Sequence, residues 1–142
     1  MHPEPLEAVV TVDLDATRER VFRALASDEI TRWWVRPGFF DTREWSGDVR
    51  AGGTWRASGI GRGNPYTLDG EFFEVEQPRR LVHTWHLVGM PFSTTVTYDL
   101  QPTANGTRII LTHAGFPSQE TCDANRIGWE TSFEALRALL GS

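Results

Sequence analysis

Residues 118–140 read SQETCDANRIGWETSFEALRALL, and this stretch decides the fold. Ser118 is a typical N-cap residue, because its hydroxyl can accept a hydrogen bond from a free backbone N–H of the first helical turn. Beyond it, mostly apolar side chains recur at alternating steps of four and three residues, which places them on one helical face. This stripe consists of Cys122, Arg126, Trp129, Phe133, Leu136 and Leu140. The pattern predicts one long amphipathic helix packed along a single core.

The sequence before this helix, from Arg43 to His113, has the alternation and the regularly spaced turn residues of β-strands. Asn105-Gly106 is its strongest hairpin signal. Gly59 to Pro65 is expected to be a mobile hairpin loop at a pocket mouth. It does not predict a phosphate-binding loop, because it leads into a strand and not into a helix. We therefore expect about six antiparallel strands in this region.

The strand that contains Phe72 and Phe73 changes its apolar phase. Tyr66, Leu68 and Phe72 occupy even positions, whereas Phe73 and Val75 occupy odd positions. Side chains of a strand alternate with a period of two, so a change of phase requires one extra residue. We expect a β-bulge near Phe72–Phe73.

The amino-terminal part predicts one further strand and two short helices. The alternation from Leu6 to Asp15 favours a strand with one buried face. Thr17 can cap a first helix, and Ser27 can cap a second. The second helix should end before Pro37, after the Trp33-Trp34 pair, because the residue before a proline disfavours helical geometry.

These elements predict an α+β protein with a single domain over residues 1–142. A sheet of about seven antiparallel strands has to curve around the long carboxy-terminal helix to bury its apolar stripe. A curved sheet lined with Trp, Phe and Tyr side chains is too wide for one helix to fill. We therefore expect a cavity between helix and sheet, a common place for small ligands.

Composition excludes several classes of protein. The 142 residues carry a formal net charge of −5, which argues against a nucleic-acid partner, since phosphate binding needs a basic surface. No apolar run is long enough to span a membrane, and residues 1–5 lack the features of a signal peptide. The single cysteine, Cys122, cannot form an internal disulfide and leaves no Cys cluster for zinc. We expect a soluble, cytoplasmic protein.

Six motifs, in order along residues 8–140, resemble the family of activator of heat-shock protein 90 ATPase homologues. They are Asp15-Ala16-Thr17 with Val21-Phe22, Trp33-Trp34, Gly52-Gly53-x-Trp55, Pro78-x-Arg80-Leu81-x-x-x-Trp85, Gly106-Thr107-x-Ile109-x-Leu111-Thr112-His113-x-Gly115-Phe116 and Gly128-Trp129-x-x-x-Phe133-x-x-Leu136. The resemblance implies the helix-grip fold of the START and birch-pollen-allergen superfamily, also called SRPBCC. Members of that superfamily are commonly binders of apolar ligands, and a few branches are cyclases, dehydratases or co-chaperone domains.

The candidate ligand-binding residues are the large side chains expected to converge between helix and sheet. They are Trp55, Phe72, His83, Trp85, Tyr98, Trp129 and Phe133. The same rings would also make a solid core, and the sequence leaves both readings open. Gly128 weakens a helix by about 1 kcal/mol relative to Ala, which indicates either close approach to a strand or space for a ligand beside Trp129.

Titratable candidates are few. His83 and His113 fall on inward strand faces, where each could contact a ligand or be a buried histidine bonded to a carbonyl or a carboxylate. His83 is the better candidate, and His113 is expected to order the turn into Gly115-Phe116. No metal is expected, because His83 and His86 face opposite sides of their strand and no other ligand completes a site. Cys122, on the apolar stripe, is expected to be a core side chain and not a nucleophile.

The sequence favours a module that binds a small, mostly apolar molecule, with His83 or Tyr98 contacting one polar group, and without an organic cofactor. An enzyme of the cyclase or dehydratase type in the same cavity is the alternative. No inward carboxylate partners His83, so no catalytic residue is assigned. A chaperone-stimulating domain is a further alternative, but related co-chaperones carry an additional amino-terminal domain. Because the first strand here begins at residue 6, no chaperone partner is expected, and a homodimer is left open.

Overall fold

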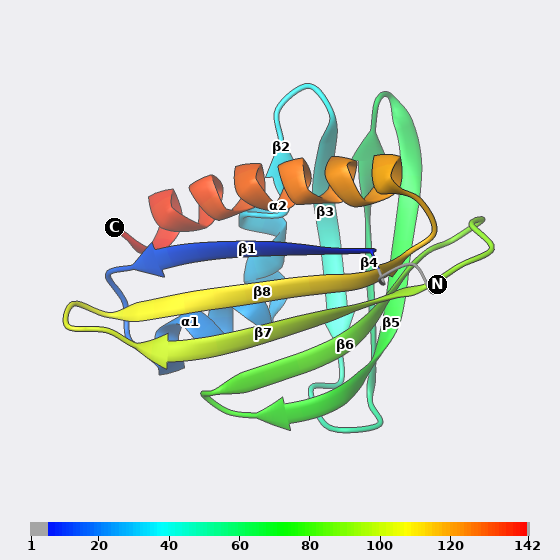
Figure 1. The fold of residues 1–142 in the computed structure, drawn as a ribbon. Coiled ribbons are helices and arrows are strands. Elements are labelled where there is room, and N and C mark those ends of the chain that lie inside the picture. Colours follow the sequence, from blue (N-terminus) through cyan, green and yellow to red (C-terminus); the bar gives the residue numbers. More distant parts are fainter. Residues whose placement is uncertain (1–5, 142) are drawn as a thin grey trace, which may run out of the picture.

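The structure is a computed structural model that describes residues 6–141. The stretch in which no signal peptide was expected, residues 1–5, lies outside the described residues. Within the described part, the chain folds into one antiparallel sheet, two short helical segments and one long helix (Figure 1). No helix in this part of the chain is both long and apolar enough to cross a membrane.

The sheet of residues 6–141 has eight strands in the order β1-β8-β7-β6-β5-β4-β3-β2. They are β1 (Leu6–Leu14), β2 (Val35–Arg36), β3 (Phe40–Gly47), β4 (Thr54–Gly61), β5 (Asn64–Glu76), β6 (Arg80–Leu87), β7 (Thr94–Pro102) and β8 (Thr107–Phe116). The helical segments are α1 (Arg18–Leu25), the 3-10 helix η1 (Asp28–Arg32) and α2 (Gln119–Leu140). Strands β2 to β7 each pair with the next strand along the chain, and β1 completes the sheet by pairing with β8.

The sheet curls around α2. Figure 1 shows the strands turning from nearly horizontal at β1 and β8 to nearly upright at β2, β3 and β4. The long helix α2 packs against β1, β2, β8 and η1. This confirms the predicted α+β architecture of a curved antiparallel sheet around one carboxy-terminal helix. The sheet has eight strands and not about seven, because Val35–Arg36 add a short strand at its edge.

The helix α2 begins and ends close to the predicted residues. Ser118 is its N-cap, and the Ser118 hydroxyl accepts a hydrogen bond from the backbone N–H of Thr121 at 3.2 Å. Arg126, which the spacing placed on the apolar stripe, is half-buried and pairs with Asp123 at 2.8 Å. The buried members of the stripe are Cys122, Trp129, Phe133 and Leu136.

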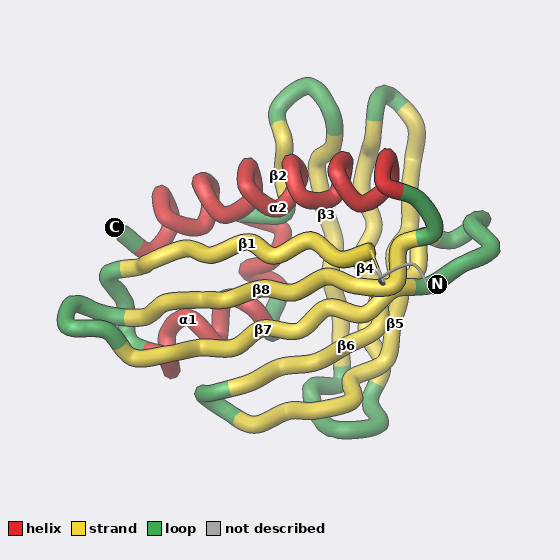
Figure 2. Tube along the Cα trace, in the orientation of Figure 1, coloured by secondary structure: helices red, strands yellow, loops and turns green. Residues whose placement is uncertain are grey.

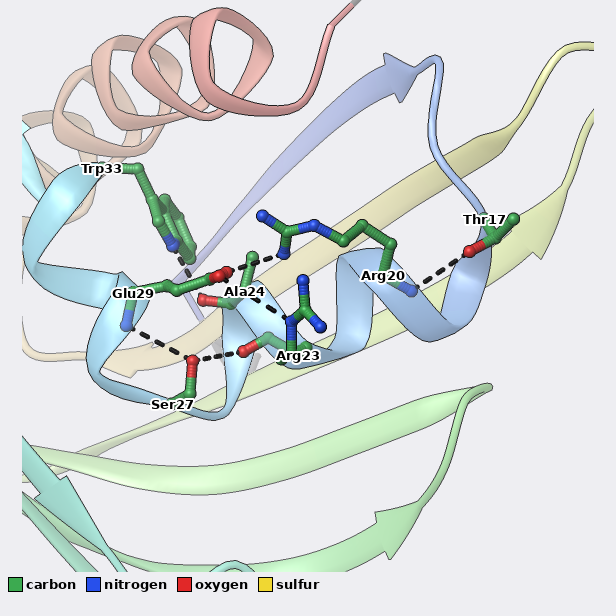
Figure 3. Close-up of polar contacts among 7 residues, drawn as sticks. All are labelled: Thr17, Arg20, Arg23, Ala24, Ser27, Glu29 and Trp33. Atoms are coloured by element: carbon green, nitrogen blue, oxygen red, sulfur yellow. Dashed lines mark hydrogen bonds and ion pairs between the residues drawn. The ribbon is translucent and has the colours of Figure 1, made fainter.

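Both short helices start at the predicted caps, which Figure 3 shows in detail. The Thr17 hydroxyl accepts from the backbone N–H of Arg20 at 3.2 Å. The Ser27 hydroxyl accepts from the backbone N–H of Glu29 at 3.3 Å. The second helix ends at Arg32, before the Trp33-Trp34 pair and not after it.

The predicted β-bulge is confirmed. The register between β5 and β6 shifts between Phe72 and Glu74, since Phe72 lies opposite His83 and Glu74 lies opposite Val82. The extra residue, Phe73, is 53% exposed while Phe72 is buried. The bulge therefore keeps Phe72 on the core side of a strand whose apolar phase changes.

The hairpin expected from Gly59 to Pro65 is present, and its Gly61 and Arg62 line a cavity, but its loop is much shorter than expected. Strands β4 and β5 extend into it from both sides, so that only Arg62 and Gly63 form the turn, as Figure 2 shows. Their φ angles are 52° and 82°, the left-handed geometry that a two-residue hairpin requires at both positions. Gly59 serves close strand packing instead, because a Cβ there would lie 2.0 Å from the Asp41 carbonyl oxygen. The loop was predicted too long because Gly59, which lies between two paired strands, was interpreted as a loop residue.

Asn105-Gly106 does lie in a hairpin, between β7 and β8. The connection is four residues long, 103–106, and the backbone N–H of Thr103 donates to the Gly106 carbonyl at 2.9 Å. The glycine is required here by the end of β1, because a Cβ on Gly106 would lie 2.1 Å from the Leu14 carbonyl oxygen.

Candidate ligand-binding cavity

A cavity of about 490 Å³ lies between the first half of α2 and the sheet. Small-molecule sites typically measure roughly 300–1,000 Å³. Its aromatic lining residues are Trp34, Phe39, Phe40, Tyr66, Trp85, Phe92, Phe116 and Trp129. Its other lining residues are Arg36, Thr42, Gly61, Arg62, Leu68, Leu87, Met90, Thr121, Ala124, Asn125, Gly128 and Ser132.

Three tryptophans form the wall of the cavity nearest the core. The ring centroids of Trp34 and Trp85 are 5.0 Å apart, and those of Trp85 and Trp129 are 5.5 Å apart. The planes of Trp34 and Trp129 are nearly perpendicular, at 89°. Tilted and edge-to-face pairs of this kind are the arrangements that aromatic rings prefer. The wall is therefore held by the rings themselves.

The position of Trp34 follows from the hydrogen bonds that join α1 to η1 (Figure 3). The Arg20 guanidinium donates to the Glu29 carboxylate at 2.7 Å across the turn between the two helices. The indole N–H of Trp33 donates to the Ala24 carbonyl at 2.9 Å, where both groups are buried. Because this hydrogen bond fixes the position of Trp33, the side chain of the next residue, Trp34, lies in the wall of the cavity.

The helix α2 presents small and polar side chains to the cavity at Asn125, Gly128 and Ser132. A Cβ on Gly128 would lie 3.7 Å from the Phe40 ring, which is an ordinary contact. Gly128 is thus not required by a close strand, and it leaves space beside Trp129. The Asn125 amide donates to the Thr121 carbonyl at 2.9 Å, so its oxygen can still accept a hydrogen bond from a ligand.

His113 lies behind this wall in a chain of hydrogen bonds. The Trp129 indole N–H donates to His113 Nδ1 at 2.9 Å, so the proton of the neutral ring is on Nε2. His113 Nε2 then donates to the Thr94 hydroxyl at 2.6 Å, and that hydroxyl donates to the Trp85 carbonyl at 3.3 Å. Burial, with a smaller contribution from nearby His83, lowers the pKa of His113 to about 3. His113 is therefore a neutral group that orients Trp129.

His83 lies deeper in the core and is not among the cavity-lining residues. Its ring contacts those of Trp55 and Phe72, with centroid distances of 5.1 and 5.9 Å. His83 Nδ1 donates to the Thr84 carbonyl at 2.9 Å, and the same carbonyl accepts from the Trp55 indole at 3.1 Å. Burial lowers the pKa of His83 to about 4, which that hydrogen bond opposes. Near neutral pH this histidine is uncharged and bonded to the backbone.

Two buried polar atoms, Trp34 Nε1 and the Tyr98 hydroxyl oxygen, have no hydrogen-bond partner among the described residues. Burial raises the pKa of Tyr98 well above its ordinary value, and the nearby Trp34 N–H opposes that rise. The two groups therefore lie near each other without the geometry of a hydrogen bond.

Fewer of the lining residues are polar than apolar: Thr42 and Ser132 are buried, whereas the charged side chains belong to residues with more exposure. The Thr42 and Tyr66 hydroxyls bond to each other on the sheet side. Burial raises the pKa of Tyr66, which keeps its hydroxyl neutral. Arg36 and Arg62 line the rim beside Phe39. A mostly apolar interior with a polar edge is suited to a ligand that is itself mostly apolar.

The residues proposed from the sequence divide into two groups. Trp85 and Trp129 line the cavity. The other members, which are not among its lining residues, are buried in the adjoining core: Trp55, Phe72, His83, Tyr98 and Phe133. The six apolar residues belong to or pack against one hydrophobic cluster, and the His83 ring contacts four of them: Trp55, Phe72, Trp85 and Tyr98.

Several lining residues were missed from the sequence. Phe40 and Thr42 were missed because β3 begins at residue 40 and not near Arg43. Met90 and Phe92 lie in the loop between β6 and β7, where periodicity carries no information. Trp34 was also missed, although the Trp33-Trp34 pair was a usable signal: both side chains are buried and both contact the Trp129 ring.

No metal centre is formed by the part of the chain that the structure describes, in which no three His, Cys, Asp or Glu side chains gather. Cys122 is buried, in a small cluster with Ala8 and Phe116.

Comparison with known proteins adds a family and a fold. The model of the family described as activator of Hsp90 ATPase homolog 1-like protein matches residues 15–141. No functionally curated protein matches the sequence significantly.

Solved structures of similar fold come from several bacteria. A protein of Chromobacterium violaceum is 23% identical, with a TM-score of 0.87 over 96% of this chain and 98% of that one. A protein of Mesorhizobium loti is 25% identical, with a TM-score of 0.76 over 94% and 95% of the two chains. A protein of Nitrosomonas europaea is 25% identical, with a TM-score of 0.77 over 94% and 93%. These similarities extend over nearly the whole length of each chain.

Proposed function

This chain belongs to the family of activator of Hsp90 ATPase homolog 1-like proteins, and on that premise we propose that it binds a small, mostly apolar molecule between α2 and the sheet. The observation that carries the proposal is the cavity of about 490 Å³ with eight aromatic lining residues. Folds of this superfamily generally bind ligands, and the cavity lies between the same elements that define the fold.

The polar groups support binding more than they support catalysis. His83, on which the cyclase or dehydratase alternative rested, is held by the Thr84 carbonyl outside the cavity lining. His113 is held by Trp129 and Thr94. General acid–base catalysis needs a titratable group within reach of the reacting atom. No observation favours the enzyme or the chaperone-stimulating alternative over ligand binding.

Calorimetric titration with a neutral apolar probe, 2-naphthaleneethanol, tests this proposal. Burying about 200 Å² of apolar surface contributes roughly 5 kcal/mol before the costs of association, so we expect a dissociation constant of about 0.2 mM at the tightest. The variant Gly128→Leu places a side chain where the glycine leaves space beside Phe40, and it should abolish saturable binding. The variant Ala138→Leu adds a comparable group on the exposed face of α2 and should leave binding unchanged.

Two outcomes would overturn the proposal. One is the absence of saturable binding by the wild-type protein, for this probe and for the acid described below. The other is equal binding by wild type and Gly128→Leu, which would place the probe outside the cavity. Native mass spectrometry of freshly purified protein offers an independent search for a bound small molecule.

The cytoplasmic location and the homodimer, both considered from the sequence, remain predictions. Cell fractionation and sedimentation analysis, respectively, would decide them.

A further inference from the structure

The charged residues that line the cavity are both arginines. Arg36, at the end of β2, and Arg62, in the turn between β4 and β5, contribute to its rim. Among the described residues that line the cavity there is no Asp or Glu. The cavity therefore has a positive edge in a protein whose formal net charge is −5.

The two guanidinium groups share one aromatic ring. The Cζ atom of Arg36 is 3.7 Å from the centroid of the Phe39 ring, and that of Arg62 is 5.5 Å from it. The backbone N–H of Arg62 donates to the Phe39 carbonyl at 2.9 Å, which ties the two turns together. In Figure 1 these turns stand side by side beyond α2, at the top of the view. Cation–π contact of this kind orients a guanidinium without neutralising its charge.

Neither guanidinium has an ion pair among residues 6–141. Asp41, close in sequence to Phe39, is paired with Arg43 at 3.2 Å. The planar donors of Arg36 and Arg62 thus remain available, and their geometry matches the two oxygens of a carboxylate.

The interior of the cavity, in contrast to its rim, is suited to apolar groups. Trp34, Trp85 and Trp129 form its inner wall, and its volume of about 490 Å³ would hold on the order of 16 waters at roughly 30 Å³ each. A ligand of about that many heavy atoms, most of them in flat apolar rings, could fill it. Flat rings can pack edge-to-face or offset against the tryptophan rings. A rigid ring system also loses less conformational entropy on binding than a flexible chain does.

We propose that the ligand is an amphipathic aromatic acid, with its rings against the three tryptophans and its carboxylate between Arg36 and Arg62 at the rim. This rests on the proposed function and adds the chemical class of the ligand. The rim is open to water, so the attraction is screened by salt and is smaller than that of a buried pair.

Three naphthalene probes of similar size separate charge from apolar contact: 2-naphthylacetate, 2-naphthaleneethanol and 2-(2-naphthyl)ethylamine. By calorimetry at low salt, we expect the acid to bind about tenfold more tightly than the alcohol and the amine to bind more weakly than either. The preference for the acid should shrink as salt is added.

The double variant Arg36→Gln/Arg62→Gln should weaken binding of the acid about tenfold and leave the alcohol within about twofold. The matched control is Arg32→Gln/Arg56→Gln, which makes the same change in net charge at two exposed arginines outside the cavity lining. It should leave both affinities within about twofold.

The results distinguish this inference from the proposed function. Equal binding of acid and alcohol, or an acid affinity that is unchanged in the Arg36/Arg62 double variant, would overturn the inference and leave the apolar site standing. Undiminished binding of the acid by Gly128→Leu would also overturn it, because the acid would then sit on the surface. Failure of every probe to bind would overturn both.

Discussion

The buried hydroxyls of Thr94 and Tyr98 differ in whether they have partners. The Thr94 hydroxyl accepts from His113 and donates to the Trp85 carbonyl, whereas the Tyr98 hydroxyl has no hydrogen-bond partner among the described residues. Removing one partner of a buried hydrogen bond leaves the other unsatisfied, at a cost of about 1–3 kcal/mol. We expect Thr94→Val to lower the free energy of unfolding by that amount. Tyr98→Phe should leave it within about 0.5 kcal/mol or raise it.

Urea unfolding of the two variants at pH 7 checks this difference. The comparison is matched, since each substitution removes one hydroxyl from a side chain that is less than 5% exposed. Equal losses in both variants would show that the hydrogen-bond chain through His113 contributes nothing beyond packing.

The two buried histidines make the protein sensitive to mild acid. The pKa of His83 is about 4 and that of His113 about 3 in the folded state, against 6.5 when unfolded. Because the unfolded chain binds protons that the folded chain excludes, stability is lost as the pH falls below 6.5. Each histidine should contribute about 1.4 kcal/mol per pH unit, down to its folded pKa.

Urea unfolding at pH 7, 6 and 5 measures this slope. His86→Gln is the control and should keep the same slope between pH 6 and 5. The folded-state pKa of His86 is raised, so this group is mostly protonated in both the folded and the unfolded state over that range. Carboxylates such as Asp13, whose pKa is lowered from 3.8, change the stability mainly below pH 5. A flat profile between pH 6 and 5 would contradict the assignment of both histidines as buried neutral groups.

At the level of elements, glycines in a turn and in a helix should respond in opposite directions to the same change. A Cβ on Gly106 would lie 2.1 Å from the Leu14 carbonyl, so Gly106→Ala should destabilise the β7–β8 turn by about 1–3 kcal/mol. A Cβ on Gly128 would meet only the Phe40 ring at 3.7 Å. Gly128→Ala should therefore stabilise α2 by about 0.5–1 kcal/mol.

Thermal melts of the two alanine variants check both signs in one experiment. If Gly128→Ala also lowered the melting temperature, the space beside Phe40 would have to be smaller than the structure has it.

The elements were predictable where a local rule decided them. The caps at Thr17, Ser27 and Ser118 follow from side chains that can bond to their own helix, and the bulge at Phe72 follows from a change of phase. The loop from Gly59 to Pro65 was predicted too long, because Gly59 is required by close packing against another strand. The close approach of Gly59 to the Asp41 carbonyl cannot be inferred from the residues next to the glycine in the sequence.

At the scale of the whole molecule, His86 connects β5 to the loop that borders the cavity. His86 Nδ1 lies 3.1 Å from Asp69 Oδ1, and Nε2 lies 3.1 Å from the Met90 carbonyl. Only the protonated ring can donate to both, and these bonds raise the pKa of His86. The contribution is fully present below pH 6.5, and it is lost as the pH rises through the folded-state pKa. We expect the loop at residues 88–93 to open more often in that upper range.

Hydrogen exchange of the amides of residues 88–93, expressed as protection factors, measures this opening. Protection should fall with rising pH in the wild type. It should be lower and independent of pH in His86→Gln. Pronounced pH dependence in the variant would assign the effect to another group.

The cavity itself was predicted in place but only partly in composition. A helix with one apolar stripe and a sheet too wide for it implied a space between them, and Trp85 and Trp129 do line it. Which rings face the space and which fill the core depends on tilt and on loop position. These are properties of the assembled molecule, so periodicity along the chain could not separate Trp55 from Trp85.

The tryptophan cluster also gives the molecule a distinctive optical property. Trp33, Trp34, Trp55, Trp85 and Trp129 form one connected set, with neighbouring centroids 5.0 to 6.3 Å apart. At such separations the transition dipoles of neighbouring indoles couple, so the near-ultraviolet circular dichroism depends on the arrangement of the set and not on single rings. Since Trp34, Trp85 and Trp129 line the cavity, an occupant would alter the near-ultraviolet circular dichroism of the entire set.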